Sequence, residues 1–240
     1  RSMSCMKHVG LNVMADPVFT VSYTGVNGGL VFCVADDPGM HSSQNEQDSR
    51  HYAEASKIMM LEPADSGECK EFTKTAFELS ERFDTPVFIR LSTRVSHSQS
   101  LVEECEPTEY QLKPYKKNID KYVMMPAKAI KRHIDVEARI AELKKFAETS
   151  ELNKIEDNGS KIGVITAGIA YMYAKEALGD KVNYLKLGMV YPMPEKLIRD
   201  FAEKCDVVYV VEELDPIIEK HCRAIGLDVI GKEKFTLLGE

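Results

Sequence analysis

The sequence predicts an α/β protein built on two doubly wound, mostly parallel sheets. Short apolar runs rich in β-branched residues alternate with helical patterns along both halves of the chain. A long amphipathic stretch at residues 127–148 separates the two halves. Polar residues follow several of the apolar runs directly, as they do where strands of an open sheet end.

Length and composition narrow the class of protein. A chain of 240 residues is long enough for one large or two ordinary domains, and 44% hydrophobic with 29% charged residues is typical of globular proteins in water. The net charge of −7 argues against a nucleic-acid partner. Since no apolar run is long enough to cross a bilayer, no membrane partner is expected. The six cysteines lack any Cys-x-x-Cys spacing, which argues against an iron–sulfur or zinc site in this chain and favours a reducing cytoplasm.

The first half reads as strand, helix, strand, helix, strand. Residues 2–9 carry no clear signal, so the sequence is expected to open in the middle of a domain. Residues 10–23 have helical periodicity broken at Asp16-Pro17. The next helix is expected to begin near Glu46, with Tyr52, Ala55 and Ile58 facing inward, and a later one has Asp65 as its N-cap. Buried strands are expected at residues 29–34, 59–63 and 86–91.

The second half repeats this alternation after a connector. Residues 98–125 lack a period, and residues 127–148 form the long helix. Strands are expected at residues 162–165, 182–186 and 207–211, with a last short one near Val229, and helices at residues 170–178, 194–204 and 215–224.

The segment that follows the first buried strand, residues 35–50, organises the first half. Pro38-Gly39 turns the chain, and an almost unbroken set of hydrogen-bonding side chains follows. One interpretation is a helix cap, with Ser43 or Asn45 at the N-cap. Because that leaves the two aspartates and the histidine unexplained, we favour a functional loop at the ligand-binding edge of the sheet. The sequence of the segment is Ala-Asp-Asp-Pro-Gly-Met-His-Ser-Ser-Gln-Asn-Glu-Gln-Asp-Ser-Arg.

This segment resembles the signature of the larger, α subunit of the indolepyruvate:ferredoxin oxidoreductases, which belong to the thiamine-diphosphate-dependent 2-oxoacid:ferredoxin oxidoreductase family. Four further stretches agree with that family in the same order. They are Met-Lys-His-Val-Gly-Leu-Asn at residues 6–12, Thr-Arg-Val-Ser-His at 93–97, Lys-Leu-Gly-Met-Val-Tyr-Pro at 186–192 and Glu-Glu-Leu-Asp-Pro at 212–216.

The resemblance implies an internal fragment of such a subunit. Residues 1–112 would be the later part of a pyrimidine-binding domain, residues 113–150 a connector with its long helix, and residues 151–240 a domain like the transketolase carboxyl-terminal domain. The complete enzyme would decarboxylate indolepyruvate or another aryl pyruvate oxidatively to the acyl-coenzyme A, with ferredoxin as electron acceptor. It would use thiamine diphosphate, Mg²⁺ and iron–sulfur clusters held elsewhere, in an oligomer with a smaller β subunit. The fragment itself is expected to be inactive and to bind no cofactor tightly.

The resemblance also suggests roles for residues around the loop. The candidate catalytic residues are His41, Ser42 and Glu46, and no metal ligand is assigned. His8 as a structural histidine is an equal alternative. The candidate cofactor-binding residues are Lys7, His8, Asp37, Ser43, Gln44 and Asn45.

Two other kinds of protein stay open. One is a metal-dependent enzyme that uses Asp36, Asp37, His41 and Glu46 as ligands. The other is a non-catalytic subunit whose loop makes a protein interface. A tight turn is favoured over a phosphate site at residues 166–170, and packing or an interface over a ligand site at Glu212-Glu213.

Overall fold

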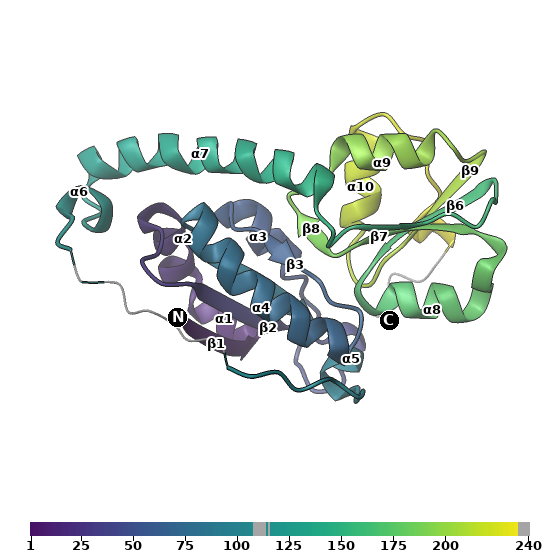
Figure 1. Ribbon diagram of the computed structural model, residues 1–240, viewed down its shortest axis with the longest axis horizontal. Coiled ribbons are helices and arrows are strands. Elements are labelled where there is room, and N and C mark those ends of the chain that lie inside the picture. Colours follow the sequence, from purple (N-terminus) through teal and green to yellow (C-terminus); the bar gives the residue numbers. More distant parts are fainter. Residues whose placement is uncertain (108–113, 115, 235–240) are drawn as a thin grey trace.

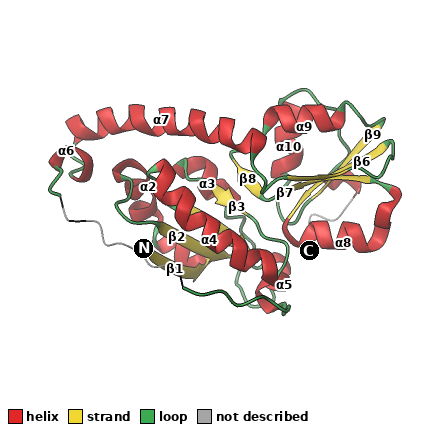
Figure 2. Cartoon of the chain, in the orientation of Figure 1, coloured by secondary structure: helices red, strands yellow, loops and turns green. Residues whose placement is uncertain are grey.

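The computed structural model describes residues 1–107, 114 and 116–234, which form two α/β units lying side by side (Figure 1). The first sheet has the order β1-β2-β4-β3-β8 and the second the order β5-β7-β6-β9. Neighbouring strands pair in parallel except β8 with β3 and β5 with β7. Helices cover both faces of each sheet (Figure 2). The predicted fold class is therefore confirmed.

The first unit takes most of its elements from the first hundred residues. Its strands are β1 (Ser2–Lys7), β2 (Leu30–Ala35), β3 (Met60–Leu61), β4 (Val87–Leu91) and β8 (Met189–Tyr191), and its helices are α1 (His8–Val13), α2 (Ala15–Thr24), α3 (Arg50–Ser56), α4 (Ser66–Phe83) and α5 (Thr93–His97). Since side chains alternate along a strand, Val31 packs with α4 on one face while Phe32 faces the opposite core. Asp65 caps α4 by accepting a hydrogen bond from the Glu68 amide at 2.8 Å, as predicted.

The second unit is smaller and is joined to the first by a common core. Its strands are β5 (Lys154–Glu156), β6 (Ile162–Ala167), β7 (Asn183–Leu187) and β9 (Val207–Val211), and its helices are α8 (Gly168–Leu178), α9 (Glu195–Ala202) and α10 (Ile217–Ala224). One hydrophobic cluster contains Phe32 and Phe88 from the first sheet as well as Ile165 and Leu187 from the second. The two units therefore bury apolar surface against each other as well as within themselves.

The predicted long helix is α7 (Pro126–Thr149), preceded by the single turn α6 (Ile119–Tyr122). Figure 1 shows α7 running above the helices of the first unit and ending at the second. Its inward face carries Val136, Ile140, Leu143 and Ala147, at the 3–4-residue spacing of an amphipathic helix. Part of the expected connector, residues 108–113 and 115, lies outside the described residues. In the part of the chain that the structure describes, no helix is long and apolar enough to cross a membrane.

Four predictions about elements were wrong. Residues 2–7 form an edge strand whose weak signal reflects its exposure, because β1 has a single neighbour and a mostly exposed surface. The helical stretch at residues 10–23 breaks at Met14, between α1 and α2, and not at Asp16-Pro17. The helix expected near Glu46 begins at Arg50, and Ala55 is exposed while Ala53 and Ser56 face inward. Near Val229 there is only an isolated bridge, between Ile230 and Tyr209.

Strands β5 and β8 were not predicted at all. The three residues of β8 leave the second unit and add an antiparallel strand to the first sheet, pairing with β3. They follow Gly188, where a side chain would collide with the Leu152 carbonyl oxygen and the Phe72 ring. Such short strands have too few residues for a periodic signal, and their pairing depends on long-range packing.

Candidate functional site

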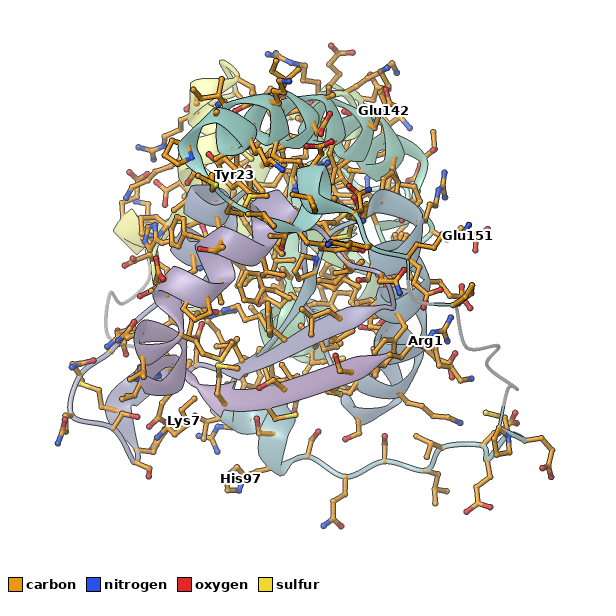
Figure 3. The ribbon with its side chains drawn as sticks, turned by 90° about the vertical axis from the view of Figure 1, so that its left-hand side faces the viewer. Arg1, Lys7, Tyr23, His97, Glu142 and Glu151 are labelled. Atoms are coloured by element: carbon orange, nitrogen blue, oxygen red, sulfur yellow. The ribbon has the colours of Figure 1, made fainter. Side chains whose placement is uncertain are left out.

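The loop of residues 36–49 leaves the carboxyl end of β2, as the sequence predicted. Its neighbour β1 ends beside it at Lys7, which Figure 3 labels at that end of the strand. Gly39 adopts φ +75°, a left-handed conformation that glycine reaches without strain, and so allows the chain to turn after Pro38. The helix-cap interpretation for Ser43 or Asn45 was wrong, because the residue that precedes α3 is Ser49.

Asp36 fixes the beginning of the loop to its end. Its buried Oδ2 accepts hydrogen bonds from the Ser49 amide at 3.0 Å, from the Ser49 hydroxyl at 2.9 Å and from Arg90 Nε at 2.7 Å. Burial raises the pKa of the Asp36 carboxyl, while Arg90 acts in the opposite direction. Asp36 therefore closes the loop onto the sheet and presents no free carboxylate to a ligand.

Asp37 fixes the first turn. Its Oδ2 accepts from the Ser42 amide at 2.9 Å and lies 3.4 Å from Lys7 Nζ, and its Oδ1 accepts from the Thr93 hydroxyl at 2.8 Å. Burial opposes ionisation, but these donors and the facing Ser43 hydroxyl together hold the pKa of Asp37 well below its usual range. The carboxylate is only 3% exposed, so it supports the loop from beneath.

The end of the loop is tied to the second unit through Arg50. Its guanidinium donates to both oxygens of Asp48, at distances between 2.6 and 3.1 Å, and to Glu212 Oε2 at 2.6 Å. It also donates to the carbonyl oxygens of Glu213 and Asp215. Nearby acids more than offset burial and raise the pKa of Arg50 further above its ordinary value. This charged contact fixes the position of the loop relative to β9.

The middle of the loop is presented to solvent. His41, Ser42, Gln44 and Asn45 are exposed, and Ser43 and Glu46 are half-buried. Glu46 Oε2 accepts the Gly39 amide at 2.8 Å across the turn, and Lys7 Nζ donates to the Ser42 carbonyl at 2.9 Å. The structure therefore leaves the candidate residues His41 and Ser42 exposed and Glu46 half-buried, with Lys7 bonded to the Ser42 backbone.

His8 occupies a different environment from Lys7. It is 1% exposed at the start of α1, and neither ring nitrogen has a hydrogen-bond partner among the described residues. A buried polar group without a partner is costly unless something satisfies it in the functional state. This leaves both alternatives for His8 open.

The sequence analysis missed the two buried arginines that hold the loop. Arg90 is 1% exposed in β4 and donates to Asp36 and, at 2.5 Å, to Glu62 Oε1. One signal was available, because an arginine within an otherwise apolar strand requires a buried acid. Arg50 gave no such signal, since its partners Glu212 and Asp215 lie more than 160 positions away.

The side chains named for the metal-site alternative do not converge on one point in this loop. Within residues 1–107, 114 and 116–234, no three His, Cys, Asp or Glu side chains are placed to hold one ion. Asp36 and Asp37 are directed toward separate partners, and Glu46 toward a backbone amide. A metal-bound diphosphate needs accessible carboxylates. Asp36 and Asp37 do not fit this role, because both are buried against protein partners.

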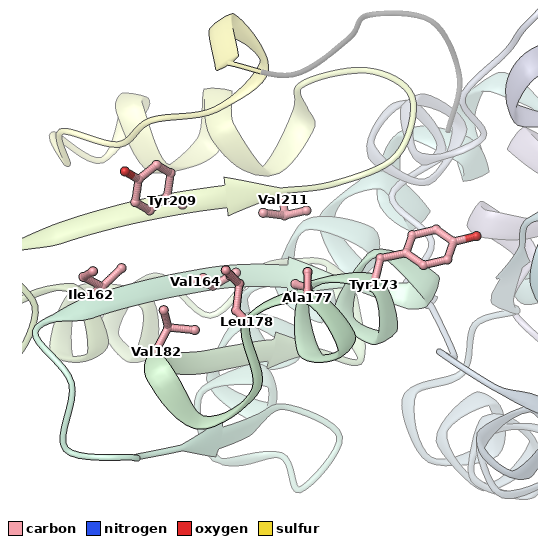
Figure 4. Close-up of a pocket in the computed structure, with 9 residues that line it drawn as sticks. Ile162, Val164, Tyr173, Ala177, Leu178, Val182, Tyr209 and Val211 are labelled. Carbon is pink, nitrogen blue, oxygen red and sulfur yellow. The ribbon is translucent and has the colours of Figure 1, made fainter.

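A second concave region lies on the second sheet and differs in chemistry. A cavity of about 480 Å³ opens between α8, β6 and β9, lined by aliphatic and aromatic side chains such as Ile162, Leu178 and Tyr209 (Figure 4). Its lining includes the phenols Tyr173 and Tyr209 but no histidine, carboxylate, lysine or cysteine. The loop is therefore the stronger candidate for a site of chemistry.

Comparison with known proteins agrees with the resemblance. No family model matches the chain. It is 40% identical over 238 residues to indolepyruvate oxidoreductase subunit IorA of Archaeoglobus fulgidus, covering 97% of this chain and 38% of that protein. The subunits of the same name from Methanothermobacter marburgensis and Pyrococcus horikoshii are 44% and 40% identical, with 95% and 97% of this chain and 39% of each protein covered.

Solved structures support the same fold. A 2-oxoglutarate:ferredoxin oxidoreductase from Magnetococcus marinus superimposes with a TM-score of 0.68 at 16% identity, over 96% of this chain and 49% of that one. A split-gene transketolase superimposes with a TM-score of 0.52 at 16% identity, over 98% of this chain and 71% of that one. The chain thus spans about two fifths of the length of the curated relatives it matches. Along nearly its whole length, the chain is therefore similar in sequence to part of the indolepyruvate oxidoreductase subunit IorA.

Proposed function

We propose that this chain is part of an oxidoreductase that decarboxylates indolepyruvate or other aryl pyruvates oxidatively to the acyl-coenzyme A, with ferredoxin as the electron acceptor. The remainder of the subunit and a smaller β subunit complete the enzyme, and thiamine diphosphate, Mg²⁺ and iron–sulfur clusters bind there. The identity of 40–44% with IorA subunits supports the reaction. Such an enzyme works in the cytoplasm as an oligomer.

One observation connects this chain to that reaction: the exposed middle of the loop is held by buried charges at both of its ends. Asp37 anchors its beginning, and Asp48 anchors its end through Arg50. Donors and acceptors fixed before substrate arrives lose less entropy on binding than mobile ones. The loop is therefore suited to orient a substrate or cofactor that approaches from outside this chain.

We assign roles within the loop accordingly. His41, Ser42 and Glu46 face the reacting substrate, since the first two are exposed and Glu46 is partly exposed beside them in the loop. Asp37 contributes by holding Lys7 and the Ser42 amide in place. The cofactor is contacted by Lys7, His8, Ser43, Gln44 and Asn45.

The same arrangement supports a preference for bulky substrates. At positions 36 and 37 the loop has buried aspartates, and so no arginine there that could bind the substrate carboxylate. We propose that His41 and Ser42 bind that carboxylate. Comparable specificity constants for pyruvate and indolepyruvate in the complete enzyme would contradict this assignment.

The direct test uses the complete enzyme with Ser42→Ala and His41→Ala. Each variant should lower kcat/KM for indolepyruvate by about tenfold or more, because a hydrogen bond to a charged group contributes about 1.5–3 kcal/mol. Ser2→Ala, at the amino end of β1 in the same sheet, serves as the matched control and should be silent. Wild-type kinetics in both loop variants would refute the assignment.

The isolated chain should show no ferredoxin reduction and should bind thiamine diphosphate weakly or not at all. Most affinity for such a cofactor comes from its diphosphate and metal, for which the described residues offer no ligand set. Calorimetric titration with thiamine diphosphate and Mg²⁺ measures this. Low-micromolar binding would show that the cofactor site is misplaced.

A non-catalytic role in subunit contact is the second candidate. The exposed loop surface that could orient a substrate could equally contact another protein chain. Under that alternative, Ser42→Ala and His41→Ala would weaken assembly of the complex in sedimentation experiments while leaving turnover per assembled complex unchanged.

A further inference from the structure

Seven buried charged side chains gather where the carboxyl ends of the two sheets meet. The five acids outnumber the two arginines by three, although all seven are at most 7% exposed. Unpaired charge of this kind is unfavourable in a protein interior, so each acid needs a partner or a proton. The acids are Asp36, Asp48, Glu62, Glu212 and Glu213, and the bases are Arg50 and Arg90.

Three of the acids accept hydrogen bonds from several donors each. Asp36 receives the Ser49 amide and hydroxyl in addition to Arg90, and Asp48 receives backbone amides as well as Arg50. Glu212 accepts the amides of residues 217, 218 and 219 at the start of α10, at 2.9–3.2 Å. The positive end of the helix dipole favours its negative charge.

Glu62 and Glu213 are different. Glu62 Oε1 binds Arg90, but Glu62 Oε2 is buried without a hydrogen-bond partner among the described residues. Both carboxyl oxygens of Glu213 lack a hydrogen bond of ordinary geometry as well. The two residues are 4% and 5% exposed, and Gly168 at the start of α8 packs so closely that a side chain there would touch Glu62.

The groups that face Glu213 come from both units. Arg90 in β4 and Arg50 in α3 attract its negative charge, the Ser92 hydroxyl after β4 faces it, and Glu62 after β3 repels it. Lys232, which follows the last bridge of the second sheet, interacts with it from its own unit. The nearby positive charges already have closer acids as partners. Glu213 is thus the acid with the weakest compensation.

One proton on Glu213 would link one of its two free oxygens to the free Oε2 of Glu62. A neutral carboxyl group on Glu213 has an O–H to donate, and the free Oε2 of Glu62 is an acceptor. Two carboxylates that share a site cannot both ionise without mutual repulsion. We propose that Glu62 and Glu213 form a proton-binding site between the two units, in which the pair holds one proton from solvent as a hydrogen bond from Glu213 to Glu62.

The acidity of Glu213 supports this site. Burial, opposed by Arg90 and reinforced by Glu62, raises the pKa of Glu213 to about 7. Glu213 would thus gain and lose its proton near neutrality. The inference concerns the contact between the units and is independent of the roles proposed for the loop.

Carboxyl-carbon NMR of the ¹³C-glutamate-labelled chain tests the proposal. Between about pH 5 and pH 9, one glutamate should titrate near neutrality, well above the ordinary range, and its signal should be absent in Glu213→Gln. In Glu62→Gln the midpoint should fall by about one unit, because the repelling charge is gone. Glu219→Gln removes a buried glutamate of the same unit that is already hydrogen-bonded, by the Lys232 amide, and should leave the titration unchanged.

Every outcome decides the question. If no glutamate carbon titrates near neutrality in the unaltered chain, the proposal fails, whether or not the variants fold. If one does, but its midpoint is the same in Glu62→Gln and in the unaltered chain, Glu213 titrates alone and the shared proton is excluded. The signal of Glu213 is assigned by its loss in Glu213→Gln. The pair is supported if the midpoint of this signal shifts in Glu62→Gln but not in Glu219→Gln.

Discussion

The two ends of the loop and its middle carry similar polar residues but have different surroundings. Asp36, Asp37 and Asp48 at the ends are at most 7% exposed and are bound to arginine, amide and hydroxyl donors. His41 and Ser42 in the middle are exposed. The difference shows that an acidic residue at the carboxyl edge of a sheet can serve to fix the backbone, while its less charged neighbours stay exposed. It also shows that burial, rather than residue type, separates the two roles.

The largest expected effect comes from the ends. Arg90→Met keeps the length of the side chain but leaves Asp36 and Glu62 buried without their cation. Breaking a buried ion pair in this way costs about 3–5 kcal/mol. Urea unfolding should therefore show a decrease of that size in the free energy of unfolding. Arg199→Met on the exposed side of α9 is the control, with a change within about 0.5 kcal/mol. Equal effects of the two substitutions would mean that the buried network contributes nothing to stability.

The next effect depends on pH. It tests whether folding is coupled to protonation of Glu213, the residue of the second unit whose carbonyl oxygen accepts a hydrogen bond from Arg50. The pKa of Glu213 is raised from 4.5 to about 7 in the folded chain. A raised pKa gives stability that is complete below about 4.5 and is lost as pH rises through about 7, up to about 3 kcal/mol in total. The free energy of unfolding should therefore fall between about pH 5 and pH 8. In Glu213→Gln this fall should be largely absent, and a fall of undiminished size would assign it to other groups.

A smaller effect is expected at Asp37, because fewer charges meet there. Asp37→Asn loses the ion pair with Lys7 and places an amide where Lys7 and the Ser42 amide both donate. Hydrogen bonds to a charged group contribute about 1.5–3 kcal/mol, so unfolding should cost about 2 kcal/mol less. Since the pKa of Asp37 is lowered by folding, its contribution exists above its ordinary pKa and disappears in acid. Exposed Asp228→Asn is the control, and a difference that persists in strong acid would contradict the assignment.

Much of the fold could be predicted because it depends on local patterns. The apolar runs of β2, β4, β6 and β9, the Asp65 cap and the periodicity of α7 all occur within short stretches of sequence. Strand β1 was missed because an exposed edge strand needs few apolar residues. Strand β8 was missed because its place depends on β3, more than a hundred positions away.

The site was predictable in position but not in detail. Gly39 and the polar run after β2 located the loop correctly. Which side chains of the loop are buried depends on Arg50 and Arg90, whose partners are distant in sequence. The sequence therefore did not distinguish the buried Asp36 and Asp37 from the exposed His41. Charged residues that pair over a large sequence separation produce no periodic pattern in the sequence. Their burial can be recognised only in the folded chain.

The smallest effect on stability, and the sharpest test of the comparison, is expected at Glu46 in the middle of the loop. Glu46→Gln keeps an oxygen that can accept the Gly39 amide, and the side chain is only half-buried, so the free energy of unfolding should change by about 0.5 kcal/mol or less. If Glu46 transfers a proton in the complete enzyme, kcat with indolepyruvate should nevertheless fall by about 100-fold or more, since an amide cannot do so. Glu176→Gln on the exposed surface of α8 should change neither quantity. A loss of stability as large as that of Arg90→Met would place Glu46 among the anchoring residues, and unchanged turnover would remove it from the candidate catalytic group.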